Sequence, residues 1–318
     1  MLQTLLESVY LRVMITRHAR GKTVWVDLEV PTEDEIRDVM REFDIDERIH
    51  EEISTPTPYP LSIAFPGYSY LILHFPVAGS EDGTRSQEVD FIVGKNFLIT
   101  ARYETIESLH NLHKVLEAEE LLGLPERSGG TAELLARVVG RLYASISEEI
   151  EHAGKRLERI ERDIFAGREQ AAVRTISEAG RILLRFETGL ARHKEPLADF
   201  LAALSTPTFF GSNFEEPATH IEARRVHAAS LVASYRAIAQ ELRVTNDSLL
   251  SASQNQVTKT LTVMAFTALP LTLIASIFGM NVEAMPIVHS PNGFWIVLGI
   301  MAGAALTLYV YFKLRRWL

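Results

Sequence analysis

Residues 260–281 read TLTVMAFTALPLTLIASIFGMN, and this stretch decides the architecture because it contains no charged side chain. A second stretch without charge runs from residue 288 to 312. Each is long enough to cross a hydrocarbon core as a helix, which takes roughly 17 to 25 residues. We therefore predict a multi-pass membrane protein with two C-terminal transmembrane helices, at about 257–280 and 293–313.

The charges of the 318-residue chain fall into two regions of opposite sign. The first 256 residues hold 28 basic and 40 acidic residues, net −12, whereas the last 62 are net +3. The loop of residues 282–292 between the spans carries only Glu283. The basic residues that flank the spans are Lys259, Lys313, Arg315 and Arg316. Because basic flanks stay in the cytoplasm, we expect both termini on the cytoplasmic side of the cell (inner or plasma) membrane.

The composition excludes several classes of function. The chain has no cysteine, which removes disulfide frameworks, thiolate zinc sites and cysteine nucleophiles. It shows no glycine-rich phosphate loop, and His50-Glu51-Glu52 lacks the second histidine of a zinc-hydrolase helix. The net negative charge of the first 256 residues disfavours nucleic acid as a partner. We therefore expect no catalytic residues and no enzymatic activity.

The N-terminal third predicts a mixed α/β region. Thr32, with Glu35 three residues later, predicts the capped start of a helix that runs through Phe43. A second short helix is expected at residues 46–54. Alternating β-branched and aromatic residues, separated by turn residues, predict strands at 9–16, 23–28, 59–65, 68–77, 87–93 and 97–102.

After residue 104 the pattern is entirely helical. Apolar residues at steps of four and three predict a coiled-coil-like seam of Val139, Tyr143, Ile146, Ile150, Ala153, Leu157, Ile160 and Ile164. We expect a return helix at 169–204, kinked at Pro196, and a linker at 205–213. From about Pro217 one helix can run to Gly279, a length of roughly 90 Å.

These patterns predict an α+β membrane protein of three parts. Residues 1–212 form a mixed α/β cytoplasmic head with a helical hairpin, 213–256 a stalk helix, and 257–318 the transmembrane domain.

One stripe of the first span is small and polar. Steps of three and four place on it Asn255, Thr258, Thr262, Ala265, Leu269, Thr272 and Ser276. Polar side chains inside a membrane often face a water-filled path. Threonine and serine also favour the packing seam between neighbouring helices, so the pattern alone leaves both interpretations open.

The sequence Gly279-Met280-Asn281 closes this span and is followed by Glu283-Ala284-Met285-Pro286, a second span and a basic C-terminus. This constellation strongly resembles the CorA family of divalent-cation channels, whose signature is Gly-Met-Asn at the outer end of the first of two C-terminal spans. Further segments similar to family landmarks lie at 25–28, 90–100, 255–259 and 269–272.

The resemblance implies a homopentamer whose first spans line one pore for Mg²⁺, with Co²⁺ and Ni²⁺ as alternative ions. It assigns selection of the hydrated ion to a ring of Asn281, which Gly279 and Met280 orient, while Glu283 concentrates cations outside. It also implies a pore lined by Asn255, Thr258, Leu261, Leu269 and Thr272.

Two departures from the family pattern concern regulation and the outer loop. His220 and Ala223 occupy stalk positions near which other members keep acidic ligands for intracellular Mg²⁺, and Ile287 replaces a common glutamate. Glu215, Glu216 and Glu222, with His220, are the candidate regulatory metal ligands.

Histidine spacing leaves a zinc alternative open. His220 and His227 share one helical face, and His110 and His113 another, so each pair either binds Zn²⁺ or is a surface or interface pair without metal. Competing functions are accordingly a zinc transporter of the same fold, or a non-conducting membrane-anchored sensor or scaffold.

Overall fold

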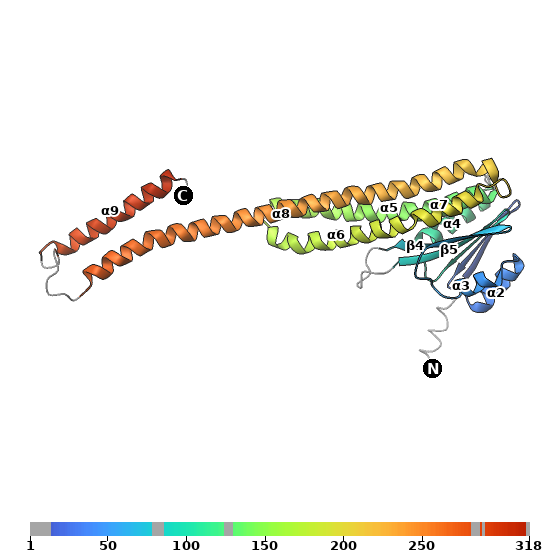
Figure 1. Ribbon diagram of the computed structural model, residues 1–318, viewed down its shortest axis with the longest axis horizontal. Helices are drawn as coiled ribbons and strands as arrows, with labels where there is room; N and C mark the ends of the chain where they lie inside the picture. Colours follow the sequence, from blue (N-terminus) through green and yellow to red (C-terminus); the bar gives the residue numbers. More distant parts are fainter. Residues whose placement is uncertain (1–13, 78–85, 124–129, 281–286, 288–289, 316–318) are drawn as a thin grey trace, which may run out of the picture. The chain divides into compact units, whose positions relative to one another are not determined.

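The structure is a computed structural model that describes residues 14–77, 86–123, 130–280, 287 and 290–315 (Figure 1). The chain divides into two compact units. The first, called the head below, comprises residues up to Gly167 together with Ala171–Leu242. The second, called the C-terminal unit, comprises Arg168–Gln170 and Arg243–Leu318.

A six-stranded mixed sheet forms the centre of the head, in the order β1-β2-β6-β5-β4-β3. All neighbours are antiparallel except β2 and β6, which are parallel. The strands are β1 Met14–Arg20, β2 Thr23–Glu29, β3 Leu61–Phe65, β4 Tyr68–Pro76, β5 Ser86–Gly94 and β6 Phe97–Arg102. The predicted strands are confirmed with one difference. Strand β1 extends to Arg20, because Gly21 (φ 55°) and Lys22 suffice for the turn to β2. Residues 9–13 of the predicted first strand lie outside the described part.

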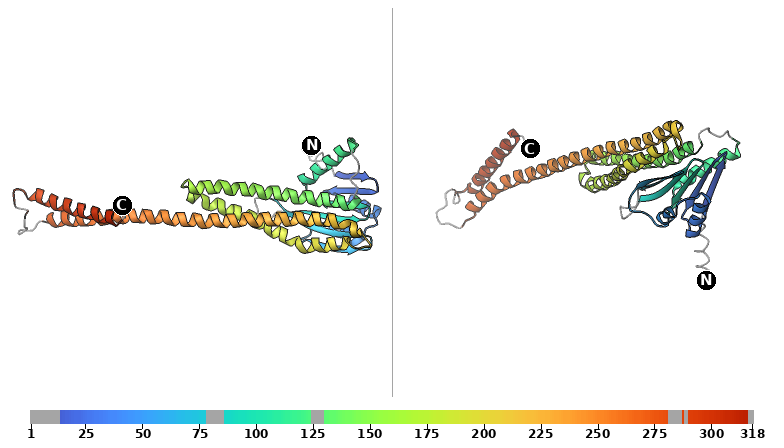
Figure 2. Two further views of the ribbon diagram at one scale, coloured as in Figure 1. Left: turned by 90° about the horizontal axis from the view of Figure 1, so that it is seen from above. Right: turned by 45° about the vertical axis from the view of Figure 1, so that its right-hand side comes forward.

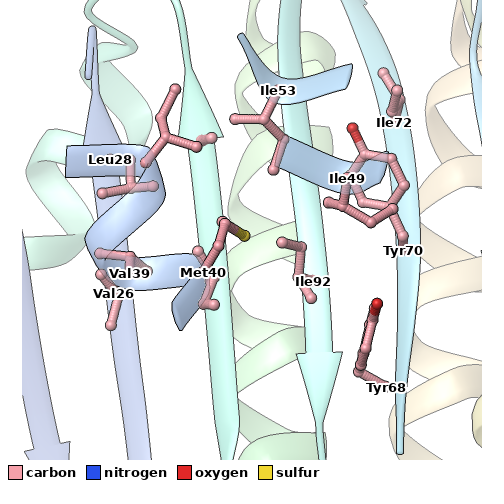
Figure 3. Close-up of a cluster of buried hydrophobic side chains, with 13 residues drawn as sticks. Val26, Leu28, Val39, Met40, Ile49, Ile53, Tyr68, Tyr70, Ile72 and Ile92 are labelled. Carbon is pink, nitrogen blue, oxygen red and sulfur yellow. The ribbon is translucent and has the colours of Figure 1, made fainter. Parts of the chain in front are cut away.

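Two short helices, α2 (Glu33–Glu42) and α3 (Glu47–Ile53), cover one face of this sheet. Thr32 and Glu35 form the predicted capping box at the start of α2. Figure 3 shows the resulting core, in which Val39, Met40, Ile49 and Ile53 from the helices meet strand residues such as Ile92. Alternation along each strand supplies these inward residues, which is the period-two pattern of a buried sheet face.

The opposite face of the sheet carries a buried polar network. The Asp27 carboxylate accepts hydrogen bonds from Thr100, from Arg102 Nη2 (2.9 Å) and from His113 Nε2 (2.8 Å) of α4, Glu107–Leu121. Burial raises the pKa of Asp27, but the hydrogen bonds from these partners and the positive charge of Arg102 hold it below its ordinary value. The His113 ring also stacks on Trp25 (4.1 Å between centroids), so the network ties α4 to the sheet.

A hairpin of long helices follows, and α5 and α6 lie side by side in Figures 1 and 2. Helix α5 spans Gly130–Phe165, α6 Glu169–Arg192 and α7 Lys194–Leu204. Every residue of the predicted seam on α5 is buried, which confirms it. The predicted return helix is interrupted at His193, because Pro196 lacks the N–H that would bond the carbonyl of Arg192.

Helix α8 runs without interruption from Glu215 to Phe278, as the absence of glycine and proline between Pro217 and Pro270 predicts. Its first part belongs to the head and its last part to the C-terminal unit. Within the head, Gly154 of α5 lies so close to α8 that an added Cβ would come within 2.3 Å of the Tyr235 ring. Arg236 of α8 also binds Glu187 of α6. The start of α8 is therefore fixed against both arms of the hairpin.

We predict that Gly154→Ala destabilises the head by about 1–3 kcal/mol, because the new methyl group overlaps Tyr235 and overpacking costs that much. Gly140→Ala in the same helix is the matched control, since nothing lies within 4 Å of its added Cβ. It should instead stabilise the helix by about 0.5–1 kcal/mol. Thermal unfolding of the full-length protein, followed by circular dichroism, measures both, and equal melting temperatures for the two variants would contradict the packing described.

Candidate ion pathway

The two helices of the C-terminal unit are each long and apolar enough to cross a membrane. Helix α9 spans Gly293–Leu314 and faces the last part of α8. Partly or fully buried side chains recur at steps of three and four on both helices. They form one stripe on each helix, and the two helices face each other along these stripes. These residues are Val263, Thr267, Pro270, Ile274 and Phe278 on α8 and Val297, Met301, Ala304, Leu308 and Phe312 on α9.

The opposite face of α8 is exposed and carries most of the residues predicted to line a pore. At about 100° per residue, Thr272 lies diametrically opposite Val263, and Thr258 and Leu261 lie within about 40° of that direction. Leu269 lies about 60° from it and is 67% exposed. Asn255 is exposed as well, but lies on the flank between the two faces.

Threonine hydroxyls in the span donate to their own helix. Thr272 donates to the carbonyl of Ala268 (2.9 Å), and Thr267 donates to that of Val263 (2.8 Å). The hydroxyl proton is thereby used, and the oxygen presents only acceptor lone pairs away from the helix. On the exposed face these oxygens suit the water protons of a hydrated cation.

Thr262 departs from the stripe of small and polar residues. It is half-buried and lines a pocket toward α9 together with Phe266. The predicted stripe therefore contains residues from different faces of α8. Its members on the exposed face are Thr258, Ala265, Leu269, Thr272 and Ser276.

The signature tripeptide is described only in part. Gly279 and Met280 follow α8 directly, and Met280 is 58% exposed. Asn281 and Glu283 lie outside the described residues. Gly279 is not the left-handed capping residue that a helix end often has, since its φ is not positive. A Cβ there would instead come within 3.0 Å of the carbonyl oxygen of Ala275, so the tight approach of the backbone favours glycine.

The candidate regulatory residues on α8 do not converge in one chain. Glu215 and Glu216 are exposed in the first turn of α8, where negative charge stabilises the helix dipole. Glu222 binds the largely buried Arg225 through two hydrogen bonds (2.9 and 2.6 Å). His220 is exposed. Among the described residues no three histidine or acidic side chains are placed to hold a metal ion.

Within the histidine pair at 110 and 113, His113 has a structural role in place of zinc binding. His113 uses Nε2 on Asp27 and Nδ1 on His18 Nε2 (2.8 Å), so neither ring nitrogen is available to a metal. This network was not predicted from the sequence, because residues 18, 27, 102 and 113 are distant along the chain. The one available signal was the pattern of polar residues inside apolar strands, at Asp27 and Thr100.

Comparisons with known proteins agree on one family. The family model described as CorA-like Mg²⁺ transporter protein matches residues 20–315. A magnesium transport protein CorA of Haemophilus ducreyi is 27% identical over 304 residues, covering 93% of this chain and 92% of the relative. A cobalt/magnesium transport protein CorA of Methanocaldococcus jannaschii is 24% identical over 253 residues, covering 78% and 77%.

The fold agrees as well. The solved structure of the CorA magnesium transporter from Methanocaldococcus jannaschii superposes with a TM-score of 0.77 at 20% identity, covering 95% of this chain and 93% of that one.

Because Glu222 pairs with Arg225, we predict that neutralising Glu222 destabilises the head and that neutralising Glu216 does not. Glu222→Gln should lower the stability of the head by on the order of 1 kcal/mol, because a largely buried guanidinium loses its charged partner. Glu216→Gln is the control, with an exposed carboxylate on the same helix. Thermal unfolding at low Mg²⁺ separates the two, and an equal loss in both variants would contradict the assignment.

Proposed function

The chain belongs to the CorA-like Mg²⁺ transporter family, and on that premise we propose that it is a passive channel for Mg²⁺, with Co²⁺ and Ni²⁺ as alternative ions. The names of its relatives support Mg²⁺ and Co²⁺. A divalent ion that crosses a potential of 100 mV gains roughly 4.6 kcal/mol, twice the value for a single charge. Import therefore needs no site for energy coupling.

The observation that carries this proposal is the character of the exposed face of α8. Between residues 248 and 278 the helix has no acidic side chain, and its exposed face offers the Thr272 oxygen as an acceptor. Mg²⁺ gives up its water reluctantly. A lining of neutral acceptors binds the hydrated ion through its waters and holds it weakly enough to release it, which conduction requires.

Selection is assigned to Asn281. Five copies of its amide oxygen, brought together at the outer end of α8, form a ring of neutral, hard acceptors that suits the hydrated ion. Gly279 and Met280 set the turn that aims this ring, and Glu283 raises the local cation concentration outside it. These roles follow the resemblance of the tripeptide to the family signature.

Pore formation requires several copies, because the exposed face of one α8 encloses nothing. We propose a homopentamer in which Asn255, Thr258, Leu261, Leu269 and Thr272 line the path. Rings of Leu261 and Leu269 close it by dewetting. The basic flanks place both termini in the cytoplasm of a cell or inner membrane.

Regulation by intracellular Mg²⁺ is proposed to be weak and distributed. His220 is a poor ligand for Mg²⁺, which prefers oxygen donors. Glu215 and Glu216 are exposed and can share an ion with a neighbouring subunit, whereas Glu222 is engaged by Arg225.

Ion flux into proteoliposomes that contain the purified protein tests the function. Mg²⁺, Co²⁺ and Zn²⁺ are compared with vesicles that lack protein. The proposal expects Mg²⁺ and Co²⁺ flux that depends on membrane potential. Flux of Zn²⁺ alone would favour the zinc transporter, and no flux of any ion would favour a sensor or scaffold.

We predict that Asn281→Ala reduces Mg²⁺ flux at least about tenfold, a change of 1.4 kcal/mol in the barrier, while the oligomer stays assembled. Asn292→Ala is the matched control, since Asn292 lies in the same loop region and its side chain makes no capping hydrogen bond. Unchanged flux and selectivity in the Asn281 variant would refute the assignment.

A second prediction concerns the gate. Leu261→Ser and Leu269→Ser should each raise resting Mg²⁺ flux severalfold, because a polar ring stays wet. Leu306→Ser on α9 is the control, with a similarly exposed leucine (64%) on the other helix. If both α8 variants behave like the parent, the hydrophobic constriction lies elsewhere, and Met264 is the next residue to replace.

A further inference from the structure

Two buried aspartates lie on opposite faces of the sheet in the head and have different partners. Asp27 and Asp90 are both fully buried. Asp27 faces α4, and the Arg102 guanidinium lies 2.9 Å from its carboxylate. Asp90 lies on the face that α3 covers, since its cross-strand neighbours Ile72 and Ala101 belong to the core drawn in Figure 3. A cation therefore balances the charge of Asp27 on its own face of the sheet.

The groups that face Asp90 are hydroxyls and carboxyls. Its Oδ2 accepts a hydrogen bond from the Tyr70 hydroxyl on β4 (2.9 Å), while its buried Oδ1 accepts none from the described residues. Glu88 lies two residues earlier on the same face of β5, Tyr103 directly follows β6, and Glu52 lies on α3. None of these four residues is basic, so no positive charge among them favours an ionised Asp90.

Glu88 and Asp90 form an acidic pair in which the two members have unequal hydrogen-bond partners. The Glu88 carboxylate accepts from the backbone N–H (2.9 Å) and the hydroxyl (3.0 Å) of Thr57, and His74 Nε2 lies 3.1 Å away. Burial and the charge of Glu88 raise the pKa of Asp90 well above its ordinary value. Asp90 is therefore the member of the pair that keeps a proton.

The Tyr103 hydroxyl has one proton and lies near two acceptors. It donates to the carbonyl of Ile53, the last residue of α3 (3.0 Å), and it also lies beside the Asp90 carboxyl group. Burial raises the pKa of Tyr103, so the hydroxyl remains a donor. Hydrogen bonds to ionised acceptors are stronger than those to neutral ones. An ionised Asp90 would therefore compete with the Ile53 carbonyl for this proton.

We propose that Asp90 is a proton-sensitive switch that controls how α3 packs on the sheet. At neutral pH its carboxyl group is protonated, and the Tyr103 hydroxyl holds the carbonyl of Ile53. Loss of the Asp90 proton to solvent leaves a buried carboxylate, which takes the hydrogen bond from Tyr103. The C-terminal end of α3 then loosens. The switch uses none of the residues assigned to the ion path.

Asp90→Asn tests the switch, because a neutral amide mimics the protonated acid. Above the ordinary aspartate pKa of about 3.9 the unfolded chain releases this proton while the folded head keeps it. The stability of the parent should therefore fall as the pH rises towards the pKa of the folded state. Thermal unfolding of the full-length protein at pH 5, 7 and 9 measures this. The melting temperature of Asp90→Asn, relative to the parent, should rise by at least about 3 °C over this range.

Two other aspartates are the controls. The pKa of Asp27 lies below its ordinary value, so Asp27→Asn should lower the melting temperature by a similar amount at all three pH values. Asp38 is exposed on α2, so Asp38→Asn should leave the melting temperature unchanged. A difference between Asp90→Asn and the parent that does not change with pH would overturn the proposal.

Hydrogen–deuterium exchange of the full-length protein locates the switch at α3. In the parent, exchange of residues 47–57, corrected for intrinsic rates, should rise at least about threefold between pH 7 and pH 9, and in Asp90→Asn it should stay constant. Tyr103→Phe removes the shared proton, so this segment should exchange faster already at pH 7 and show no further rise. No rise in the parent, or a rise that persists in Tyr103→Phe, would contradict the switch. Both readouts are independent of ion flux.

Discussion

The rest of the structure depends on one constraint, that polar groups inside a hydrocarbon layer must be satisfied within the protein. The last part of α8 meets it by remaining helical to Phe278 through Pro270, and by directing the hydroxyls of its threonines to carbonyls four residues earlier. No charged residue lies between Lys259 and Lys313 in the described part of the chain. Along the described part of α8, the oxygens available to a divalent cation are therefore neutral.

The head holds the first part of α8 in place. Contacts of Gly154 with Tyr235 and of Glu187 with Arg236 hold the first part of α8 to the hairpin. His193 connects the hairpin to the sheet, since it accepts a hydrogen bond from Tyr143 and donates one to the carbonyl of His74. These contacts connect the sheet and the hairpin to the first part of α8.

Local signals made most of the fold predictable. The capping box of Thr32 and Glu35, the seam on α5 and the glycine-free run of α8 each depend on residues a few positions apart, and the structure confirms all three. The break at His193 follows from Pro196 for the same reason. Uncharged length alone identified both candidate spans.

Features that depend on packing between distant segments could not be predicted in this way. The hydrogen bond between Asp27 and His113 joins residues 86 positions apart. The spacing of His110 and His113 therefore suggested a zinc site, whereas in the structure His113 forms a buried hydrogen bond to the sheet. Thr262 fitted a polar stripe by periodicity, yet only the position of α9 decides which side of α8 it faces. Glu222 and Arg225 are three residues apart on α8 and pair locally, but the burial of the Arg225 guanidinium depends on packing and is not visible in a charge pattern.

We propose that the face of α8 turned away from α9 lines the ion path, and two threonines on opposite faces of the helix, Thr272 and Thr267, allow a direct test. Because the chain has no cysteine, Thr272→Cys and Thr267→Cys each introduce a single thiol into a clean background. The measurement is the block of Mg²⁺ flux in proteoliposomes by a charged, water-soluble thiol reagent. We expect the reagent to block Thr272→Cys and to leave Thr267→Cys conducting, whereas block of Thr267→Cys alone would contradict a path along this face.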